Sequence, residues 1–261
     1  MGGVRPAAVA GMFYPENPNV LHSDIQSMLS SASLKTHAPK AIIVPHAGYI
    51  YSGPIAASAY AQLSPLRERI KRVILLGPCH RVPLRGLAAT SADYFETPLG
   101  SISIDRQAIE RIISLPQVQQ FDSTHAQEHS LEVQLPFLQE VLAEFTLVPL
   151  VVGDAEAEEV DEVLELLWGA DETLIVISSD LSHYHDYRSA RELDSRTSLA
   201  IEQLNGASIQ YGDACGRNPV IGLLLAARKH HLKAITLDLR NSGDTAGDRS
   251  RVVGYGAWAF E

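Results

Sequence analysis

Cysteine is scarce in this chain, whose 261 residues contain only two, Cys79 and Cys215. Two cysteines are too few for the disulfide framework of small secreted domains. Both lie in glycine-containing segments that have the character of site loops. A chemical role is therefore a better prediction than crosslinking for at least one of them.

Long apolar runs and clusters of basic residues are absent as well. No run approaches the roughly 20 apolar residues that a membrane-spanning helix needs, and residues 1–6 lack the apolar core of a signal peptide. The net charge is -10 at pH 7, which disfavours nucleic acid and anionic membranes, because both are bound through clustered Lys and Arg. These absences predict a cytoplasmic protein with no nucleic-acid or membrane partner.

Two common catalytic motifs are also missing. Residues 243–248 are glycine-containing, but they lack the Lys-Ser/Thr ending of a phosphate loop. No serine has the Gly-x-Ser-x-Gly setting of the α/β-hydrolases. Nucleotide binding and serine hydrolysis are therefore disfavoured, and residues 243–248 are interpreted as a flexible connection before the last strand.

Apolar runs alternate with segments of helical periodicity along the whole chain. The strands are predicted at 41–44, 73–76, 146–152, 174–178, 234–239 and 252–260. The helices are predicted at 18–30, 54–63, 107–114, 131–145, 156–168, 188–203 and 218–230. Residues 81–105 are interpreted as an antiparallel excursion or a substrate-facing flap. The pattern predicts an α/β fold, with one sheet covered by helices on both faces and one domain over residues 1–261.

Three of the predicted strands are each followed within a few residues by a histidine: His46, His80 and His183. The carboxyl ends of parallel strands meet at one edge of a sheet, where open α/β folds hold their ligands. A neutral imidazole on a short loop there is a good donor for zinc, iron or copper. Each histidine alone is as easily explained as a cap on a strand end, but two in matching contexts favour His46 and His80 as metal ligands.

The polar loop after the third of these strands contains Asp180 and His183. Asp180 could orient His183 and raise its basicity, which would make an acid/base catalyst. The alternative is a loop whose polar residues only satisfy the next helix. The composition of the loop slightly favours catalysis.

Cys215 precedes the predicted helix 218–230. The helix N-terminus and Arg217 are expected to lower the pKa of its thiol and to favour thiolate, which binds metals and attacks electrophiles. From spacing alone, a third metal ligand and a small buried residue at a tight turn are equally supported. Cys79 is expected to pack behind its loop.

His129 and Glu132 are three residues apart at a predicted helix start and would share one helix face. His129 could act as a second acid/base, and either residue could contact substrate. An ordinary acidic helix start is an alternative of similar weight.

Five short motifs together resemble one known family. They are Val44-Pro45-His46-Ala47-Gly48-Tyr49, Leu76-Gly77-Pro78-Cys79-His80, Glu128-His129-Ser130-Leu131-Glu132, Ser178-Ser179-Asp180-Leu181-Ser182-His183, and Cys215-Gly216-Arg217 with Pro219. In this order they resemble the Memo family, whose microbial members are called AmmeMemoRadiSam system protein B. The resemblance extends over nearly the whole chain.

The Memo family is similar in fold to class III extradiol dioxygenases of the LigB type, non-haem iron(II) enzymes that open catechol rings with dioxygen. The resemblance implies that His46, His80 and Cys215 are metal ligands. It also implies that His183 stands in the place of the acid/base histidine, with Asp180 beside it. The dioxygenases have a carboxylate where this chain has Cys215, and a softer donor admits copper or zinc besides iron(II).

Two classes of function follow from the resemblance. The first is a non-haem iron(II) redox enzyme acting on a small, catechol-like substrate, with a pocket lined by Tyr49, Tyr51, His129 and His183. The second is a peptide-binding or metal-handling protein, because eukaryotic Memo proteins are described as binding phosphorylated receptor peptides and metal. The microbial family name further suggests a radical-SAM protein and an AMMECR1-like protein as partners.

Overall fold

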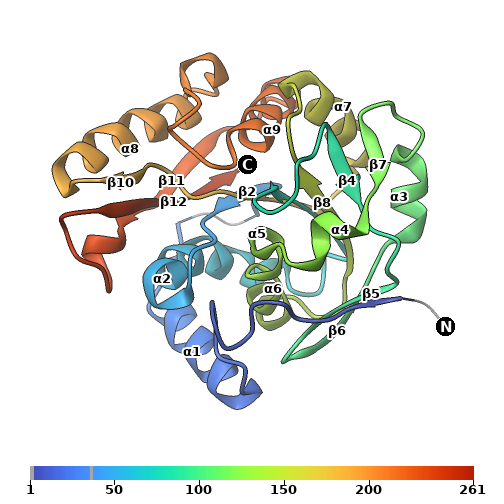
Figure 1. The fold of residues 1–261 in the computed structure, drawn as a ribbon, viewed down its shortest axis with the longest axis horizontal. Coiled ribbons are helices and arrows are strands. Elements are labelled where there is room, and N and C mark those ends of the chain that lie inside the picture. The colour runs from blue at the N-terminus through green and yellow to red at the C-terminus, as the bar shows by residue number, and fades with distance from the viewer. Residues whose placement is uncertain (1–2, 36–37) are drawn as a thin grey trace.

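The computed structural model describes residues 3–35 and 38–261, so the first two residues of the opening segment lie outside it. A large sheet forms its centre (Figure 1). The strands of this sheet are β2 (Ala41–Val44), β3 (Arg72–Pro78), β4 (Leu87–Ala89), β7 (Val118–Gln120), β8 (Thr146–Val152), β9 (Thr173–Ser178), β10 (His183–His185), β11 (Ala234–Asn241) and β12 (Val252–Phe260). Their order is β10-β12-β2-β9-β3-β8-β4-β7, and β11 also pairs with β12 in antiparallel register.

The middle of the sheet is parallel. β9 lies between β2 and β3, and β8 pairs with the other side of β3, all in parallel register. These strands are almost entirely buried, as expected for apolar runs covered by helices on both faces. The chain therefore leaves Val44, Pro78 and Ser178 at the same edge of the sheet, as the sequence predicted.

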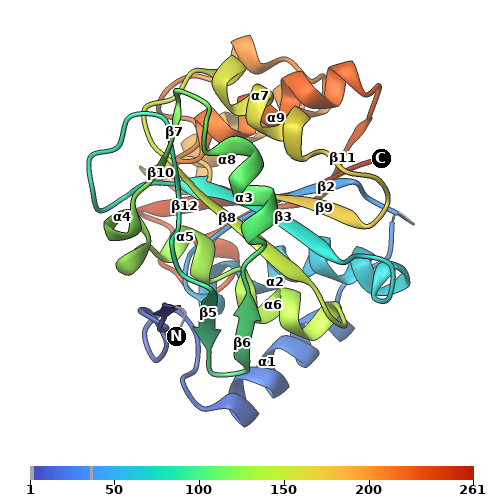
Figure 2. The same cartoon turned by 90° about the vertical axis from the view of Figure 1, so that its right-hand side faces the viewer.

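Helices cover both faces of the sheet (Figures 1 and 2). One face carries α7 (Ala157–Leu167), α8 (Tyr187–Glu202) and α9 (Arg217–Lys229), with α3 (Arg106–Ile112) beside α7. The other face carries α1 (Pro18–Ser30), α2 (Tyr49–Tyr60), α5 (His129–Glu132) and α6 (Leu135–Val141). The mixed α/β fold is thus as predicted, and the helix starts have recognisable caps: Asn17 caps α1 through its side chain, and Glu156 and Glu159 form a capping box on α7.

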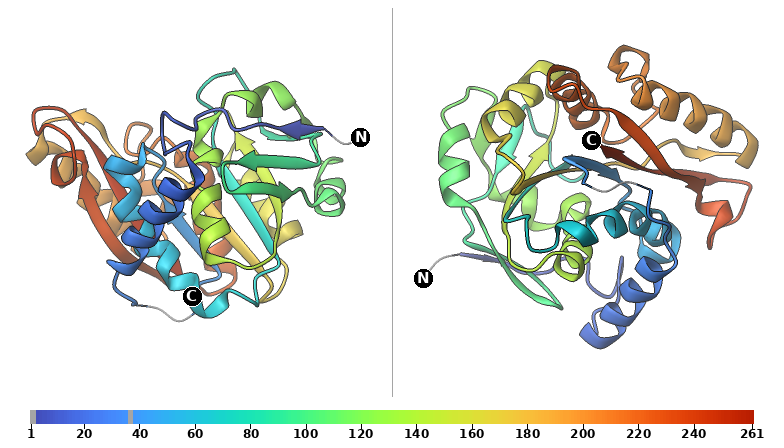
Figure 3. Two further views of the ribbon diagram at one scale, coloured as in Figure 1. Left: turned by 90° about the horizontal axis from the view of Figure 1, so that it is seen from below. Right: turned by 180° about the vertical axis from the view of Figure 1, so that it is seen from behind.

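A second, three-stranded sheet lies beside the N-terminal segment (Figure 3). β1 (Val4–Arg5) pairs in parallel with β5 (Tyr94–Thr97), and β5 pairs with β6 (Gly100–Ser103) as an antiparallel hairpin. This hairpin lies within residues 81–105, where the sequence suggested an antiparallel excursion or a flap. The first strand of that range, β4, instead joins the main sheet. The hairpin holds the N-terminal strand in place.

Two helix predictions were wrong in their bounds. The helix expected at 54–63 begins earlier, at Tyr49, so its N-terminus lies only three positions after His46. The helix expected at 131–145 is divided into α5 and α6, with Pro136 in the first turn of α6. Proline lacks the N–H that a continuous helix would need there. The remaining short helices are α4 (Asp122–Ala126), η1 (Ala61–Leu66), η2 (Gly206–Ser208) and η3 (Ser242–Asp244).

No helix in the part of the chain that the structure describes is long and apolar enough to cross a membrane. The cytoplasmic location and the assignment of residues 1–261 to one domain stay predictions.

Candidate metal centre

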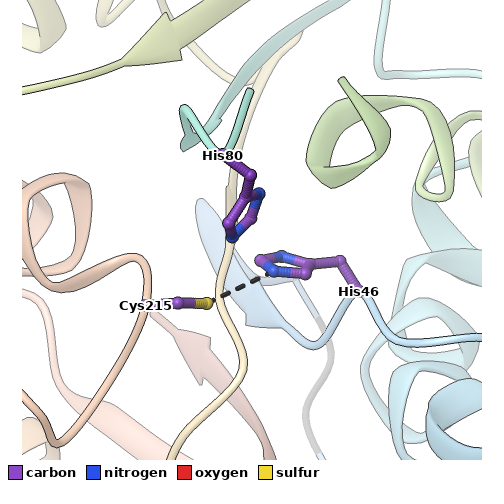
Figure 4. Close-up of side chains that lie close together, drawn as sticks. All are labelled: His46, His80 and Cys215. Atoms are coloured by element: carbon purple, nitrogen blue, oxygen red, sulfur yellow. Dashed lines mark hydrogen bonds between the residues drawn. The ribbon is translucent and has the colours of Figure 1, made fainter. Parts of the chain in front are cut away.

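His46, His80 and Cys215 converge at the carboxyl edge of the parallel strands (Figure 4). Each offers one donor atom, and the three atoms lie within 4.8 Å of one another. The Sγ atom of Cys215 is 3.3 Å from Nε2 of His46. Metal–ligand bonds of about 2.0–2.3 Å in a tetrahedral site keep the ligand atoms about 3.5 Å apart. The spacing of this cluster therefore suits a metal ion.

The hydrogen bonds of Ser178 orient the imidazole of His46. The Ser178 hydroxyl donates its only proton to the carbonyl oxygen of Ser130 at 2.6 Å, and it accepts from Nε2 of Gln134 at 2.8 Å. Its contact with Nδ1 of His46, at 2.9 Å, is then a hydrogen bond that His46 donates. The proton sits on Nδ1, so the lone pair of Nε2 faces Cys215.

A buried carboxylate orients His80 in the same way. Glu128 accepts from the backbone N–H of His80 at 2.6 Å and from Nδ1 of its ring at 2.9 Å. Burial raises the pKa of this carboxyl, but the hydrogen bonds from His80 outweigh it and lower the pKa to about 2. Carboxylate–histidine pairs of this kind fix the tautomer of metal-binding histidines and raise their basicity. Nε2 of His80 is thereby left free for a metal.

The loop that carries Cys215 is tied to the end of β9. The N–H of Asp180 points at Sγ of Cys215, 3.3 Å away, and the N–H of Cys215 donates to the carbonyl of Asp180 at 3.2 Å. Gly216 donates to the Ser179 hydroxyl at 2.9 Å. A Cβ at Gly216 would lie only 2.7 Å from the carbonyl oxygen of Ser178. Glycine is thus required for the loop to approach the strand this closely.

The expected lowering of the Cys215 pKa was wrong. Burial, followed by the charge of Asp180, raises the pKa of this thiol to about 12. Arg217 does not face the thiol, because its Nε donates to the carbonyl of Ile209 at 2.8 Å. The thiol is neutral at ordinary pH, and a bound cation would be needed to displace its proton.

His129 lies beside this cluster. The centroid of its ring is 4.7 Å from that of His80 and 5.4 Å from that of His46, and Phe13 covers it at 4.6 Å. Its buried Nδ1 makes no hydrogen bond, although it lies 3.3 Å from a carboxylate oxygen of Glu128. Burial lowers the pKa of this ring to about 4. His129 is therefore a neutral imidazole next to the centre, and it forms a second possible donor group with His80 and Glu128.

The predicted pairing of Asp180 with His183 is absent from the hydrogen bonds of the described residues. Asp180 instead accepts from the backbone N–H of His46 at 2.7 Å, and burial raises the pKa of its carboxyl to about 7. His183 starts β10, and burial lowers its pKa. A protonated His183 would also lower the pKa of His46, after burial and the charges of His80 and His129. Asp180 thus holds the His46 loop and does not orient His183.

Two predicted substrate contacts are engaged elsewhere. The Tyr49 hydroxyl donates to the carbonyl of Val133 at 2.7 Å, inside the core. The Glu132 carboxylate is buried and accepts from Ala8 and Tyr14 of the N-terminal segment, which argues against a contact with substrate. Tyr51 is the exception, because 36% of it is exposed.

Glu128 and Ser178, which bind the rings of His80 and His46, were not among the predicted site residues. Both stand in the motifs that carry the family resemblance, next to residues that were selected. Glu128 immediately precedes His129 and caps the start of α5. Because Glu128 precedes a predicted helix, capping of that helix was a sufficient explanation for it. Its contact with His80 forms only in the folded chain.

The chain matches a family model described as Memo-like protein over residues 5–259. It is 40% identical to a MEMO1 family protein of Aquifex aeolicus (strain VF5), and the match covers 97% of each chain. It is 34% identical to a MEMO1 family protein of Metallosphaera sedula, over 98% of this chain and 99% of the relative. A third MEMO1 family protein, from Ignicoccus hospitalis, is 36% identical over 98% of each chain.

One solved structure has a similar fold. It is the crystal structure of the uncharacterized protein JW3007 from Escherichia coli K12, with a TM-score of 0.50 and 14% sequence identity. The match covers 82% of this chain and 98% of that protein. At this identity the likeness concerns the fold alone.

Proposed function

Because this chain belongs to the Memo-like protein family, we propose that His46, His80 and Cys215 bind iron(II) and that the protein is an oxidoreductase. Its proposed substrate is a small, catechol-like aromatic molecule, as in the LigB-type dioxygenases that the family resembles. The observation that carries the proposal is the convergence of three donor atoms within 4.8 Å, with the free nitrogens of both imidazoles turned toward the thiol.

The donor set suits iron(II) in chemical terms. Two neutral imidazoles and one thiolate are ligands that iron, copper and zinc accept, and three protein ligands leave positions open for substrate. When bound, iron(II) would supply Lewis acidity and redox chemistry at this edge of the sheet. The chain itself contributes the orientation of the ligands, through Ser178 for His46 and through Glu128 for His80.

His183 is the proposed general base. Its ring is partly exposed, and burial lowers its pKa, so it is neutral at pH 7 and can accept a proton from a substrate hydroxyl. His129 is a second neutral imidazole, and its ring stacks on that of His80. For Asp180 we propose a positioning role, since its carboxylate holds the backbone of His46.

A cavity of about 340 Å³ borders Cys215 and extends between the end of β8 and the start of α9. Gly153, Asn218 and Tyr211 contribute to its walls. A volume of this order accommodates a small aromatic molecule. Of the three proposed ligands only Cys215 lines this cavity, so it offers a small molecule space on the thiol side of the centre.

A second candidate function, that of a peptide-binding or metal-handling protein, is favoured by a separate surface groove. The groove measures about 490 Å³ and lies between α2 and the N-terminal segment, where Met12, Ile50 and Tyr51 are exposed. A soft thiolate ligand suits copper transfer as much as it suits catalysis. Under this alternative a peptide, a radical-SAM protein or an AMMECR1-like protein would be the partner.

The test is the metal content of protein purified without oxygen. Wild type, His46→Ala and Cys215→Ser are compared by elemental analysis, with Cys79→Ser as the matched control, because Cys79 donates to Val82 and lies outside the donor group. The proposal is supported if wild type contains near-stoichiometric iron, if His46→Ala and Cys215→Ser lose it, and if Cys79→Ser keeps it. Catechol-dependent oxygen uptake would then support the reaction.

Other outcomes would change the proposal. Copper or zinc in place of iron would favour the metal-handling function. A wild-type protein that takes up none of these metals after reconstitution would refute the centre altogether.

A further inference from the structure

Arg5 enters the interior from the N-terminal strand, where its guanidinium lies 5.4 Å from the ring centroid of Phe95. Its hydrogen bonds and ion pair all go to one short segment. Its Nε donates to the carbonyl of His125 at 3.0 Å, and its Nη2 donates to the carbonyl of Glu128 at 2.9 Å. Its Nη1 pairs with the carboxylate of Glu132. Only 7% of Arg5 is exposed. One guanidinium thus fixes three points of the segment from His125 to Glu132.

The carboxylate of Glu132 also binds residues that follow Arg5. It accepts from the N–H groups of Ala8 at 2.8 Å and Val9 at 3.0 Å, and from the hydroxyl of Tyr14 at 2.6 Å. The N-terminal segment from Arg5 to Tyr14 is therefore folded around this carboxylate. Phe13, within the same segment, covers the ring of His129.

Arg5 binds the backbone at Glu128, the residue whose carboxylate contacts His80. The carbonyl of Glu128 accepts a hydrogen bond from Arg5. Its carboxylate accepts hydrogen bonds from the backbone N–H and from Nδ1 of His80. Glu128 lies at the start of α5, which has only four residues. A helix this short has little stability of its own, so external contacts must set the position of Glu128.

We propose that Arg5 is a positioning residue of the metal centre, and that it acts through Glu128 on His80. This inference rests on the proposed metal site. It makes the N-terminal segment part of the site, although none of its residues belongs to the donor group. The planar fork of arginine, with five donors, reaches all three acceptors at once, whereas lysine cannot do so.

The experiment measures iron(II) affinity under anaerobic conditions by competition with a chromogenic chelator. Substitution of a residue that orients a metal ligand weakens metal binding by about 10–100-fold, which is the expectation for Glu128→Gln. For Arg5→Lys we expect a loss of about 3–10-fold, smaller because one more residue intervenes. In the double variant the two losses should not add, because Arg5 acts only through Glu128.

A control variant separates positioning from general stability. Arg72→Lys weakens the ion pair with Asp105 at the far end of β3. It should keep iron(II) affinity within about twofold of wild type. The cobalt(II) derivative of Arg5→Lys should keep its thiolate absorption, because Cys215 is unaffected, while its ligand-field bands shift.

A measurement on the unaltered protein covers the case in which Arg5→Lys does not fold. If Arg5 couples the segment to the centre, the coupling is reciprocal. Zinc(II) or iron(II) should therefore slow amide hydrogen exchange at Ala8 and Val9, whose N–H groups donate to Glu132.

Unchanged exchange at both amides would overturn the inference, as would unchanged affinity in Arg5→Lys when Glu128→Gln binds iron(II) more weakly. In both cases the metal centre would stand. Metal affinity that survives His46→Ala would instead overturn the proposed centre itself.

Discussion

Nδ1 of His46 lies 2.9 Å from the hydroxyl of Ser178, which accepts a hydrogen bond from the N–H of the ring. The same hydroxyl donates its proton in a hydrogen bond to the carbonyl of Ser130, so it cannot donate to His46. This relationship decides the tautomer of His46. It also connects the ends of β2 and β9, which pair with Val44 opposite Ser178.

Ser178→Ala is therefore expected to weaken metal binding by about 10-fold or more, because the imidazole loses the partner that keeps Nε2 unprotonated. The variant also leaves buried polar groups unpaired, which should lower the free energy of unfolding by about 1–3 kcal/mol. Metal affinity is measured by chelator competition, and stability by urea unfolding of the metal-free protein.

Ser198→Ala is the matched control for this prediction. Ser198 is also a buried serine, but its hydroxyl contacts Trp258 and Thr236, away from the metal ligands. Its substitution should lower stability and leave metal affinity unchanged. Equal metal affinity in both variants would mean that Ser178 has no role in orienting His46.

Gly216→Ala is expected to displace Cys215 from the two histidines. The added Cβ would come within 2.7 Å of a backbone oxygen of β9, which has no freedom to move away. We expect the distance from Sγ to His46 to increase and metal affinity to fall by about 10-fold. Gly212→Ala, in the same loop, meets no atom within 4 Å and should bind metal as wild type does. A crystal structure of Gly216→Ala with Cys215 unmoved would contradict this explanation.

Much of the fold could be predicted because its strands are continuous apolar runs and its helices are amphipathic. The strand ends then placed His46 and His80 at one edge of the sheet without any knowledge of side-chain contacts. The insertion of β9 between β2 and β3 could not be predicted in the same way. Strand order depends on long-range packing, which local periodicity does not encode.

The environment of individual side chains could not be predicted from the sequence either. Glu132 binds Arg5 across 127 positions of the chain, so its helical spacing with His129 gave no sign of this partner. The pKa of Cys215 depends on burial and on where Arg217 points, and both follow from the folded loop. Local motifs therefore indicated which residues gather at this edge of the sheet, whereas the contacts of Glu128, Ser178 and Arg5 required the structure.

His183→Ala tests the proposed division between metal binding and proton transfer. Since His183 is not in the donor group, the variant should bind about as much iron as wild type. Its catechol-dependent oxygen uptake should fall by about 100-fold or more, the usual contribution of a general base. His185→Ala removes an exposed histidine of the same strand and serves as the control. Loss of iron in His183→Ala would make this residue a ligand.

Asp194→Asn is expected to stabilise the protein at neutral pH. Asp194 is only 3% exposed, and its carboxylate accepts from the N–H of Ser182 at 3.1 Å. Burial raises its pKa to about 6, the hydrogen bonds from Ser182 and the charge of His185 lower it, and Asp213 raises it. Asparagine keeps an oxygen for Ser182 and has no charge to bury.

The sign of the pH dependence follows from the two pKa values of Asp194. The unfolded chain has a pKa of about 3.9, so between about pH 4 and pH 6 the folded protein binds more protons than the unfolded one. The contribution of Asp194 to stability should therefore fall as the pH rises through this window, and the advantage of Asp194→Asn should grow by about 1 kcal/mol from about pH 5 to pH 8. Urea unfolding at the two pH values measures this change.

Asp186→Asn, at the N-cap of the same helix, should behave in the opposite way. Hydrogen bonds from Ser189 and Arg188 lower the pKa of Asp186, so its contribution to stability is present at neutral pH and is lost as the pH falls. The variant should thus be less stable than wild type at neutral pH, and the difference should shrink in acid. If both variants changed stability in the same direction with pH, burial of Asp194 could not be the cause. Opposite pH dependences of stability for Asp186→Asn and Asp194→Asn would show that the environment of each carboxylate causes the effect.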